Sequence, residues 1–274
     1  MLSLLGVSGI TMNRYNPSKK DPINGSQGKW IANEDLHIWS IPIAAPCPDP
    51  LQAQPQTEVW QQLLSKEERQ RLNRFSHPDS QYNYLYSRVA LRNILSGYLK
   101  TSARELALIV SPLGKPQVAP DTYPLDLRFN LSHTRGLALL AVTRGQEVGI
   151  DIEMMGRQRN IKALALRYFA PTTNSELSML TAERQEEAFL QLWTQFEAYK
   201  KAKGEGLRGG DKCLPLSLYA PPDEQFYYLL PEGYAQKNWQ AAVLGLKSHE
   251  GYICSVVTER RARIKYFRFR AGMA

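Results

Sequence analysis

The feature that most constrains this chain is a six-residue stretch, Val148–Glu153, in which aliphatic residues alternate with glycine or acidic residues. A period of two predicts a β-strand, because successive side chains of a strand point to opposite faces of its sheet. The three aliphatic residues then face a core, whereas Gly149, Asp151 and Glu153 share the other face. Two carboxylates on one face repel each other unless solvent or a cation relieves the repulsion. The stretch therefore predicts either a charged, solvated strand edge or a cation site.

The rest of the chain predicts helices and short strands. A capping-box pattern at Ser65 and Glu68 predicts the start of a helix. Hydrophobic periodicity predicts long helices over residues 79–99 and 183–203. Shorter helices are expected at 57–64, 161–169 and 175–180, and strands at 36–41, 106–110, 128–132, 137–143, 147–153, 226–230, 239–246, 252–257 and 264–269.

These elements predict an α+β protein made of two halves, each with helices packed on an antiparallel sheet. A turn at residues 143–146 is the best candidate for the boundary between the halves. We therefore expect a polar N-terminal extension, 1–33, an N-terminal half, 34–145, and a C-terminal half, 146–274, that carries the metal site.

Composition narrows the class of partner. The chain has 274 residues and a net charge of +8, which favours an acidic protein, a nucleic acid, an anionic membrane or a phosphorylated small molecule. We find no basic motif interleaved with aromatic residues, and no apolar run near the ~20 residues that span a bilayer, so neither nucleic acid nor membrane is expected. Three widely spaced cysteines form no disulfide or zinc pattern, which predicts a cytoplasmic protein.

A third carboxylate comes from the helix predicted over 183–203. Glu197 and Lys201 are four residues apart, so they share one side of the helix, at the margin of its aromatic sector. An ordinary surface ion pair explains that spacing equally well. If Glu197 joins Asp151 and Glu153, however, the three hard oxygen ligands suit Mg²⁺, or Mn²⁺, better than zinc.

Several other residues could bind a phosphate. Ser132 and His133 end a predicted strand, and Lys115 sits in a Gly-Lys-Pro turn. A nucleophilic Ser–His pair has little support, because no neighbouring acid or oxyanion motif accompanies it. A capping serine, a core histidine and solvated surface cations are the plain alternatives. Further positive charge could come from three arginines of the N-terminal half, Arg71, Arg88 and Arg92.

Taken in order, these motifs resemble the Sfp-type 4'-phosphopantetheinyl transferases over residues 65–207. The resemblance rests on five segments, which are Arg71 to Phe75, Gly114-Lys115-Pro116, Phe129 to His133, Val148 to Glu153 and Trp193 to Lys201. It implies two pseudo-symmetric α+β halves with the active site in the cleft between them. It also implies transfer of the 4'-phosphopantetheine arm of coenzyme A to a serine of an acidic apo acyl or peptidyl carrier protein. The coproduct is 3',5'-ADP, and the pathways are those of fatty acids, polyketides or nonribosomal peptides.

The resemblance also implies a role for each candidate residue. Asp151, Glu153 and Glu197 would hold Mg²⁺ against the pyrophosphate of coenzyme A. Glu197 would deprotonate the carrier serine, and Lys201 would contact the pyrophosphate and help the leaving group. The nucleotide end would be contacted by Lys115, Ser132, His133, Arg71 and Arg88.

One departure from the family pattern keeps other readings open. Phe196 occupies a position where the family usually has a lysine, so that role is either lost or moved to Lys200. One alternative is a non-catalytic protein that uses a basic cleft to bind an acidic partner. Another is a metal-dependent phosphohydrolase. A chain whose two halves bury each other is expected to be a monomer.

Overall fold

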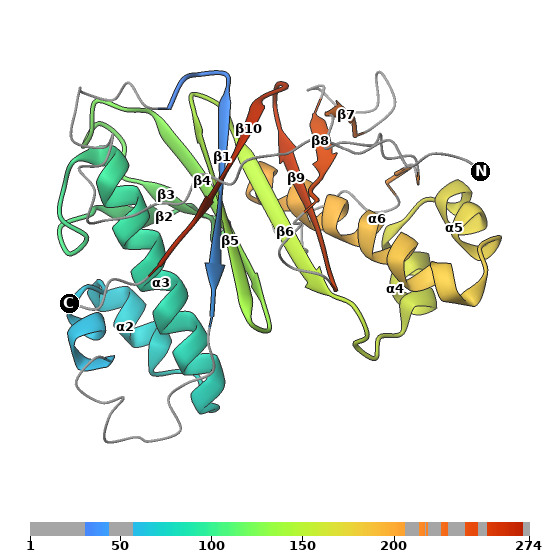
Figure 1. Cartoon of the computed structure of the whole chain (residues 1–274), viewed down its shortest axis with the longest axis horizontal. Helices are drawn as coiled ribbons and strands as arrows, with labels where there is room; N and C mark the ends of the chain where they lie inside the picture. The colour runs from blue at the N-terminus through green and yellow to red at the C-terminus, as the bar shows by residue number, and fades with distance from the viewer. Residues whose placement is uncertain are drawn as a thin grey trace, which may run out of the picture.

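The computed structural model describes residues 31–43, 57–205, 214–216, 218, 226–229, 239–245 and 251–270. Most of the expected N-terminal extension, 1–33, lies outside the described residues. The described part is an α+β fold built on two four-stranded sheets, as predicted (Figure 1).

The two sheets divide the strands between them. The first sheet has the order β10-β1-β5-β4 and contains β1 (Asp35–Pro42), β4 (Leu127–Thr134), β5 (Leu137–Arg144) and β10 (Arg263–Arg268). The second has the order β6-β9-β8-β7 and contains β6 (Val148–Met154), β7 (Tyr227–Tyr228), β8 (Gln240–Val243) and β9 (Tyr252–Thr258). A separate hairpin pairs β2 (Leu108–Val110) with β3 (Pro116–Val118).

Each four-stranded sheet is covered by one 22-residue helix, α3 (Pro78–Leu99) or α6 (Ala182–Lys203). The short helix α2 (Lys66–Leu72) precedes α3, and its capping box is the one expected from the sequence, with Ser65 accepting from the Glu68 N–H. Two further helices, α4 (Ile161–Tyr168) and α5 (Pro171–Ser178), precede α6. In the described part of the chain, no helix is long and apolar enough to cross a membrane.

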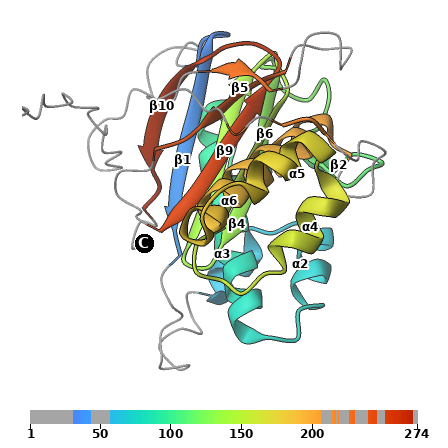
Figure 2. The same ribbon diagram turned by 90° about the vertical axis from the view of Figure 1, so that its right-hand side faces the viewer.

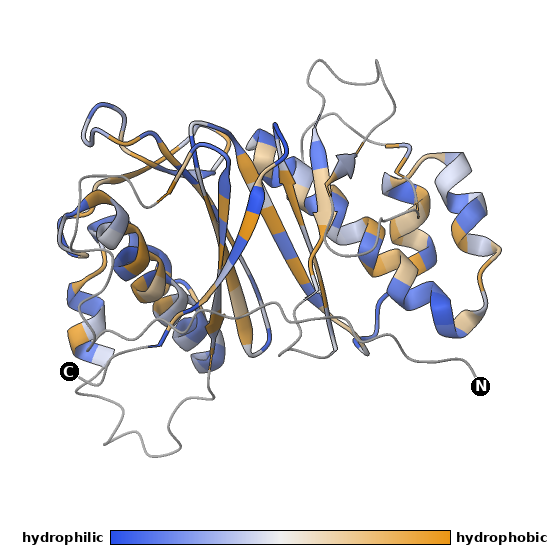
Figure 3. Ribbon diagram, turned by 45° about the horizontal axis from the view of Figure 1, so that its top comes forward, coloured by the Kyte–Doolittle hydropathy of each residue, from blue (hydrophilic) through white to orange (hydrophobic). Residues whose placement is uncertain are grey.

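Three apolar clusters fix the layers as helix, sheet, sheet, helix (Figures 1 and 2). Alternation along β5 illustrates the arrangement, because Leu140 packs toward α3 whereas Leu139 packs between the two sheets. The same alternation holds in β6, where Val148, Ile150 and Ile152 join the cluster between the sheets. Figure 3 shows the apolar residues gathered on the strands and on the inward sides of the long helices. The polar face of β6 is therefore turned toward α6.

The last strand departs from the expected division at residues 145 and 146. β10 follows β9 in the chain, yet it pairs with β1 of the first sheet and runs parallel to it. The register explains this crossing. β9 ends at Thr258, which lies opposite Val148 at the start of β6. β6 follows directly on β5, and Thr143, near the end of β5, pairs with Leu36, near the start of β1. The short turn after β9 therefore delivers β10 to the beginning of β1, where the buried Asp35 accepts from Arg263 (2.8 Å) and Lys265 (2.7 Å).

Candidate functional site

Close contact between β6 and α6 brings the predicted carboxylates together. A Cβ atom at Gly149 would lie 1.9 Å from the carbonyl oxygen of Ala198 and 2.4 Å from the nitrogen of Ala202. No side chain fits there, so the helix backbone rests directly on the strand. Asp151, the next residue on the same face of the strand, is thereby placed against the turn of α6 that carries Lys201.

Asp151 lies at the centre of a three-residue cluster. It is 5% exposed, and its Oδ1 accepts from Lys201 Nζ (2.6 Å) and from Ser132 Oγ (2.8 Å). Lys201 Nζ also donates to Ser132 Oγ (2.9 Å). The second carboxylate oxygen of Asp151 is buried and has no hydrogen-bond partner. A buried unpaired carboxylate oxygen is costly, and it marks the place where a cation or a donor from a ligand fits.

The other two predicted metal ligands flank this cluster. Burial, together with the charge of Asp151, raises the pKa of Glu197 to about 7, although Lys201 opposes the shift. Burial and Asp151 also raise the pKa of Glu153, although Arg159 opposes that shift. Arg159 binds the Glu153 carboxylate at 2.5 Å. Among the described residues, no three His, Cys, Asp or Glu side chains are grouped closely enough to hold a metal ion as they stand.

Strand β4 supplies the opposite wall of the site. Asn130 and Ser132 are two residues apart and therefore share one face of the strand, which is turned toward β6. The side-chain oxygen of Asn130 accepts from the backbone N–H of Ile150 (3.0 Å), and Ser132 bonds Asp151. These two contacts fix the register of β6 against β4 across the two halves.

A cavity of about 420 Å³ adjoins the cluster and is lined by both halves. Five of the residues predicted to contact phosphates line it, which are Arg71, Arg88, Lys115, His133 and Lys201. The sixth, Ser132, lies next to it through its bond to Lys201. The sequence thus predicted side chains that the fold brings together from α2, α3, β4 and α6.

Positive charge dominates one wall of this cavity. The guanidinium groups of Arg71 and Arg88 lie over the ring of Tyr84, at 5.7 and 5.4 Å from its centroid. His133 is an exposed residue that lines the same cavity, yet the surrounding protein partly desolvates its ring. That desolvation lowers the pKa of His133, and the charges of Lys201, Arg88 and Arg71 lower it further. The wall therefore favours an anion.

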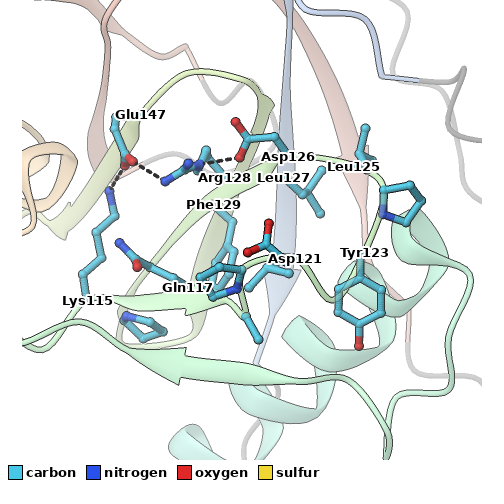
Figure 4. A pocket seen from close by; sticks show the side chains of 15 residues that line it. Lys115, Gln117, Asp121, Tyr123, Leu125, Asp126, Leu127, Arg128, Phe129 and Glu147 are labelled. Carbon is cyan, nitrogen blue, oxygen red and sulfur yellow. Dashed lines mark hydrogen bonds and ion pairs between the residues drawn. The ribbon is translucent and has the colours of Figure 1, made fainter.

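Two predicted cations are committed to protein contacts instead. Lys115 is 8% exposed, and its ammonium group donates to Glu147 Oε2 (2.6 Å), to the Ala202 carbonyl (2.9 Å) and to the Val148 carbonyl (3.2 Å). Figure 4 shows the side chain reaching Glu147 from the turn. Burial lowers the pKa of Lys115, and Glu147 opposes that shift. Arg92, which could have brought further positive charge, is likewise buried and bonds Glu68 (2.7 Å) and two backbone carbonyls, so its guanidinium is engaged within the protein.

The departure at Phe196 has a structural reason. Its side chain is 1% exposed and packs among the rings of Tyr168, Phe169 and Trp193, on the side of α6 away from the cluster. The alternative that its role passes to Lys200 is not supported, because the Lys200 ammonium is buried and pairs with Glu205 (2.9 Å).

Sequence reasoning gave no role to Asn130 or Arg159. The period of two could have identified Asn130, because it shares a strand face with Ser132. Arg159 lies in the segment between β6 and α4, where no periodic pattern indicates direction, so its contact with Glu153 appears only in the structure.

Comparisons with known proteins agree on one family. A model described as the 4'-phosphopantetheinyl transferase superfamily matches residues 147–257, and one described as 4'-phosphopantetheinyl transferase, N-terminal, matches 52–144. The chain is 33% identical to the 4'-phosphopantetheinyl transferase HetI of Nostoc over 65% of its length and 72% of that protein. It is 30% identical to a putative 4'-phosphopantetheinyl transferase of Synechocystis over 72% and 83%. It is also 28% identical to Sfp of Bacillus subtilis over 61% and 70%.

Proposed function

Because this chain belongs to the 4'-phosphopantetheinyl transferase superfamily, we propose that it transfers the 4'-phosphopantetheine arm of coenzyme A to a serine of an apo acyl or peptidyl carrier protein. The observation that carries this proposal is the Lys201–Asp151–Ser132 cluster beside a cation-lined cavity built from both halves. A pyrophosphate ester with an anionic nucleotide end matches that combination of charges.

The cavity is proposed to take the nucleotide end of coenzyme A. Arg71 and Arg88 are positioned to meet its 3'-phosphate, and Arg side chains suit phosphate because their planar donors can engage two oxygens. His133 and Lys201 line the same cavity. We therefore propose that the pyrophosphate lies near Lys201 and Asp151.

The reaction is a displacement at phosphorus. The carrier serine Oγ forms a bond to the β-phosphorus of coenzyme A, the bond from that phosphorus to the bridging oxygen breaks, and 3',5'-ADP leaves. Glu197 is the proposed acceptor of the serine proton, because its environment makes it a stronger base than an exposed carboxylate. Lys201 compensates the charge that develops on the departing oxygen.

The three carboxylates are chemically suited to a divalent cation, although among the described residues they are not grouped closely enough to hold one as they stand. The unpaired oxygen of Asp151 and the mutual repulsion of Asp151, Glu153 and Glu197 indicate a deficit of positive charge at this point. Bound Mg²⁺ would supply charge neutralisation for the pyrophosphate. Glu153 would have to turn from Arg159 to serve as a ligand, so Asp151 is the best supported of the three.

The carrier protein is proposed to be acidic. The chain carries a net charge of +8, and complementary charge speeds the encounter of two proteins. A protein that used the same cavity without catalysis would bind an acidic partner with no need for coenzyme A or a metal.

The test is to incubate the protein with apo carrier proteins, coenzyme A and Mg²⁺ and to measure the intact mass of each carrier. We expect a gain equal to one phosphopantetheine arm and equimolar release of 3',5'-ADP. Release of that nucleotide without a modified carrier would instead indicate a hydrolase. No mass gain with carriers from fatty-acid and natural-product pathways would refute the proposal.

A further inference from the structure

Lys115 connects three elements that come from both halves of the chain. Its backbone belongs to the turn between β2 and β3, which lines the 420 Å³ cavity. Its ammonium group lies among Glu147 and the Val148 carbonyl, where β6 begins, and the Ala202 carbonyl, in the last turn of α6. A lysine ammonium has three donors, and these three acceptors account for all of them.

The stem of Lys115 is also in contact with the end of α6. Gly204 caps that helix with a φ of +75°, and a Cβ atom there would lie 3.4 Å from Cδ of Lys115. The side chain therefore passes along the end of α6 before it reaches the Ala202 carbonyl. Helix carbonyls in the last turn have no partner within the helix, so this bond completes the helix end.

Glu147 holds the ammonium group in this position. Its two carboxylate oxygens accept from Lys115 (2.6 Å) and from Arg128 (2.8 Å), and its backbone N–H donates to Glu259 (2.9 Å). Figure 4 shows Lys115 and Arg128 converging on it. Glu147 does not line the 420 Å³ cavity. Glu147 itself would therefore make no direct contact with a ligand in that cavity.

We propose that Lys115 is a positioning residue that ties the Gly-Lys-Pro turn to β6 and to the last turn of α6, and that it is not a phosphate ligand. By holding Ala202 it fixes the neighbouring Lys201, whose ammonium bonds Asp151. By holding its own turn against β6 it fixes one wall of the cavity. The effect of Lys115 on coenzyme A binding rests on the proposed function. The structural role of Lys115 in linking its turn to β6 and α6, called the Lys115 strut below, does not.

The test uses Lys115→Met, Glu147→Gln and the double variant, with Lys162→Met as a control that removes one exposed lysine far from the cavity. Affinities for coenzyme A and for 3'-dephospho-coenzyme A are measured by calorimetry at a temperature well below unfolding. Amide hydrogen exchange is followed in residues 200–205 of the ligand-free proteins. If Lys115→Met does not fold, the double variant carries the test, because it leaves no unpaired charge from this pair.

We expect Lys115→Met to weaken both ligands by the same factor, roughly tenfold, and to speed exchange in the last turn of α6. Glu147→Gln should act in the same direction, and the double variant should lose no more than Lys115→Met alone, because the two residues form one unit. Lys162→Met should match the parent protein in both measurements.

Three results would overturn the strut. The first is a much larger loss for coenzyme A than for its dephospho form in Lys115→Met, which would mean direct contact with the 3'-phosphate. The second is unchanged binding in Glu147→Gln. The third is unchanged exchange in residues 200–205. If the parent protein binds neither ligand, the proposed function fails separately, and the exchange measurement still decides the strut.

Discussion

Replacing Gly149 with alanine adds one methyl group where the backbone of α6 lies directly on β6. The new Cβ would sit 1.9 Å from the Ala198 carbonyl oxygen, and ordinary contact begins at 3.4 Å, so the two elements must separate by about 1.5 Å. The atoms that the new Cβ meets, the Ala198 carbonyl oxygen and the Ala202 nitrogen, belong to the backbone of α6, so no rotamer change can relieve the clash.

The separation has an energetic and a chemical consequence. Overpacking of a well-filled interior typically costs about 1–3 kcal/mol in stability. A clash with the backbone of α6 is expected at the upper end, about 3 kcal/mol. For a chain of this size, that corresponds to a fall of roughly 6–12 °C in melting temperature. Because Lys201 is on the displaced turn, its 2.6 Å bond to Asp151 would stretch to roughly 4 Å. Misplacement of about 1 Å can cost on the order of a hundredfold in rate.

The assay compares Gly149→Ala with Gly145→Ala. Gly145 has a φ of +63° with no heavy atom near its Cβ position, so alanine there costs about 1 kcal/mol in backbone strain without moving α6. Urea unfolding gives the stability of each variant, and mass gain of a carrier protein gives the transfer rate. We expect both variants to lose stability and only Gly149→Ala to lose transfer. Wild-type stability and rate in Gly149→Ala would refute the close packing of β6 against α6.

The remaining predictions concern three separate residues. Asp151→Ala should abolish transfer while leaving the circular dichroism spectrum unchanged; retained activity would remove this carboxylate from the site. Phe196→Lys, which restores the usual family residue, should lower the free energy of unfolding by about 3–5 kcal/mol, because the cation would enter an aromatic cluster; a stable, more active variant would contradict this. Burial lowers the pKa of His37 from 6.5 to about 4. Between about pH 6.5 and pH 4 the unfolded chain is therefore protonated at His37 whereas the folded chain is not. The free energy of unfolding falls by up to roughly 3 kcal/mol as pH falls through this range. Urea unfolding of His37→Gln should show a correspondingly weaker loss of stability in acid, and an unchanged pH dependence would rule His37 out. Asp35 lies 3.9 Å from His37, and its pKa is lowered in the fold because its bonds with Lys265 and Arg263 outweigh desolvation, so the difference between the two proteins reports His37 together with its interaction with Asp35.

The sequence predicted the elements of the fold well because local signals agreed with the global packing. The capping box at Ser65 and Glu68 and the period-two pattern of Val148–Glu153 both specify structure within a few residues. The partner of the last strand could not be predicted in this way. Its pairing with β1 depends on where β9 ends relative to β5 and β6, which is a property of the assembled sheets.

The candidate site divides along the same line. Spacing alone could place Asp151 and Glu153 on one face, and Glu197 and Lys201 on one turn of a helix. Spacing could not show which charged side chains would be paired with neighbouring groups of the protein. Lys115 donates to three acceptors in the protein, and Arg159 binds Glu153. Neither contact can be inferred from the spacing of residues in the sequence.

Helix geometry decides which lysine at the end of α6 serves the cluster. Lys200, Lys201 and Lys203 lie within four residues, but successive residues turn by about 100° around a helix. Lys200 and Lys203 both reach Glu205, just beyond the helix end, each at 2.9 Å. Lys201 points instead along the row that contains Glu197 and reaches Asp151 on β6. The i, i+4 relation to the third carboxylate was therefore the informative signal in the sequence, and the density of positive charge at the helix end was not.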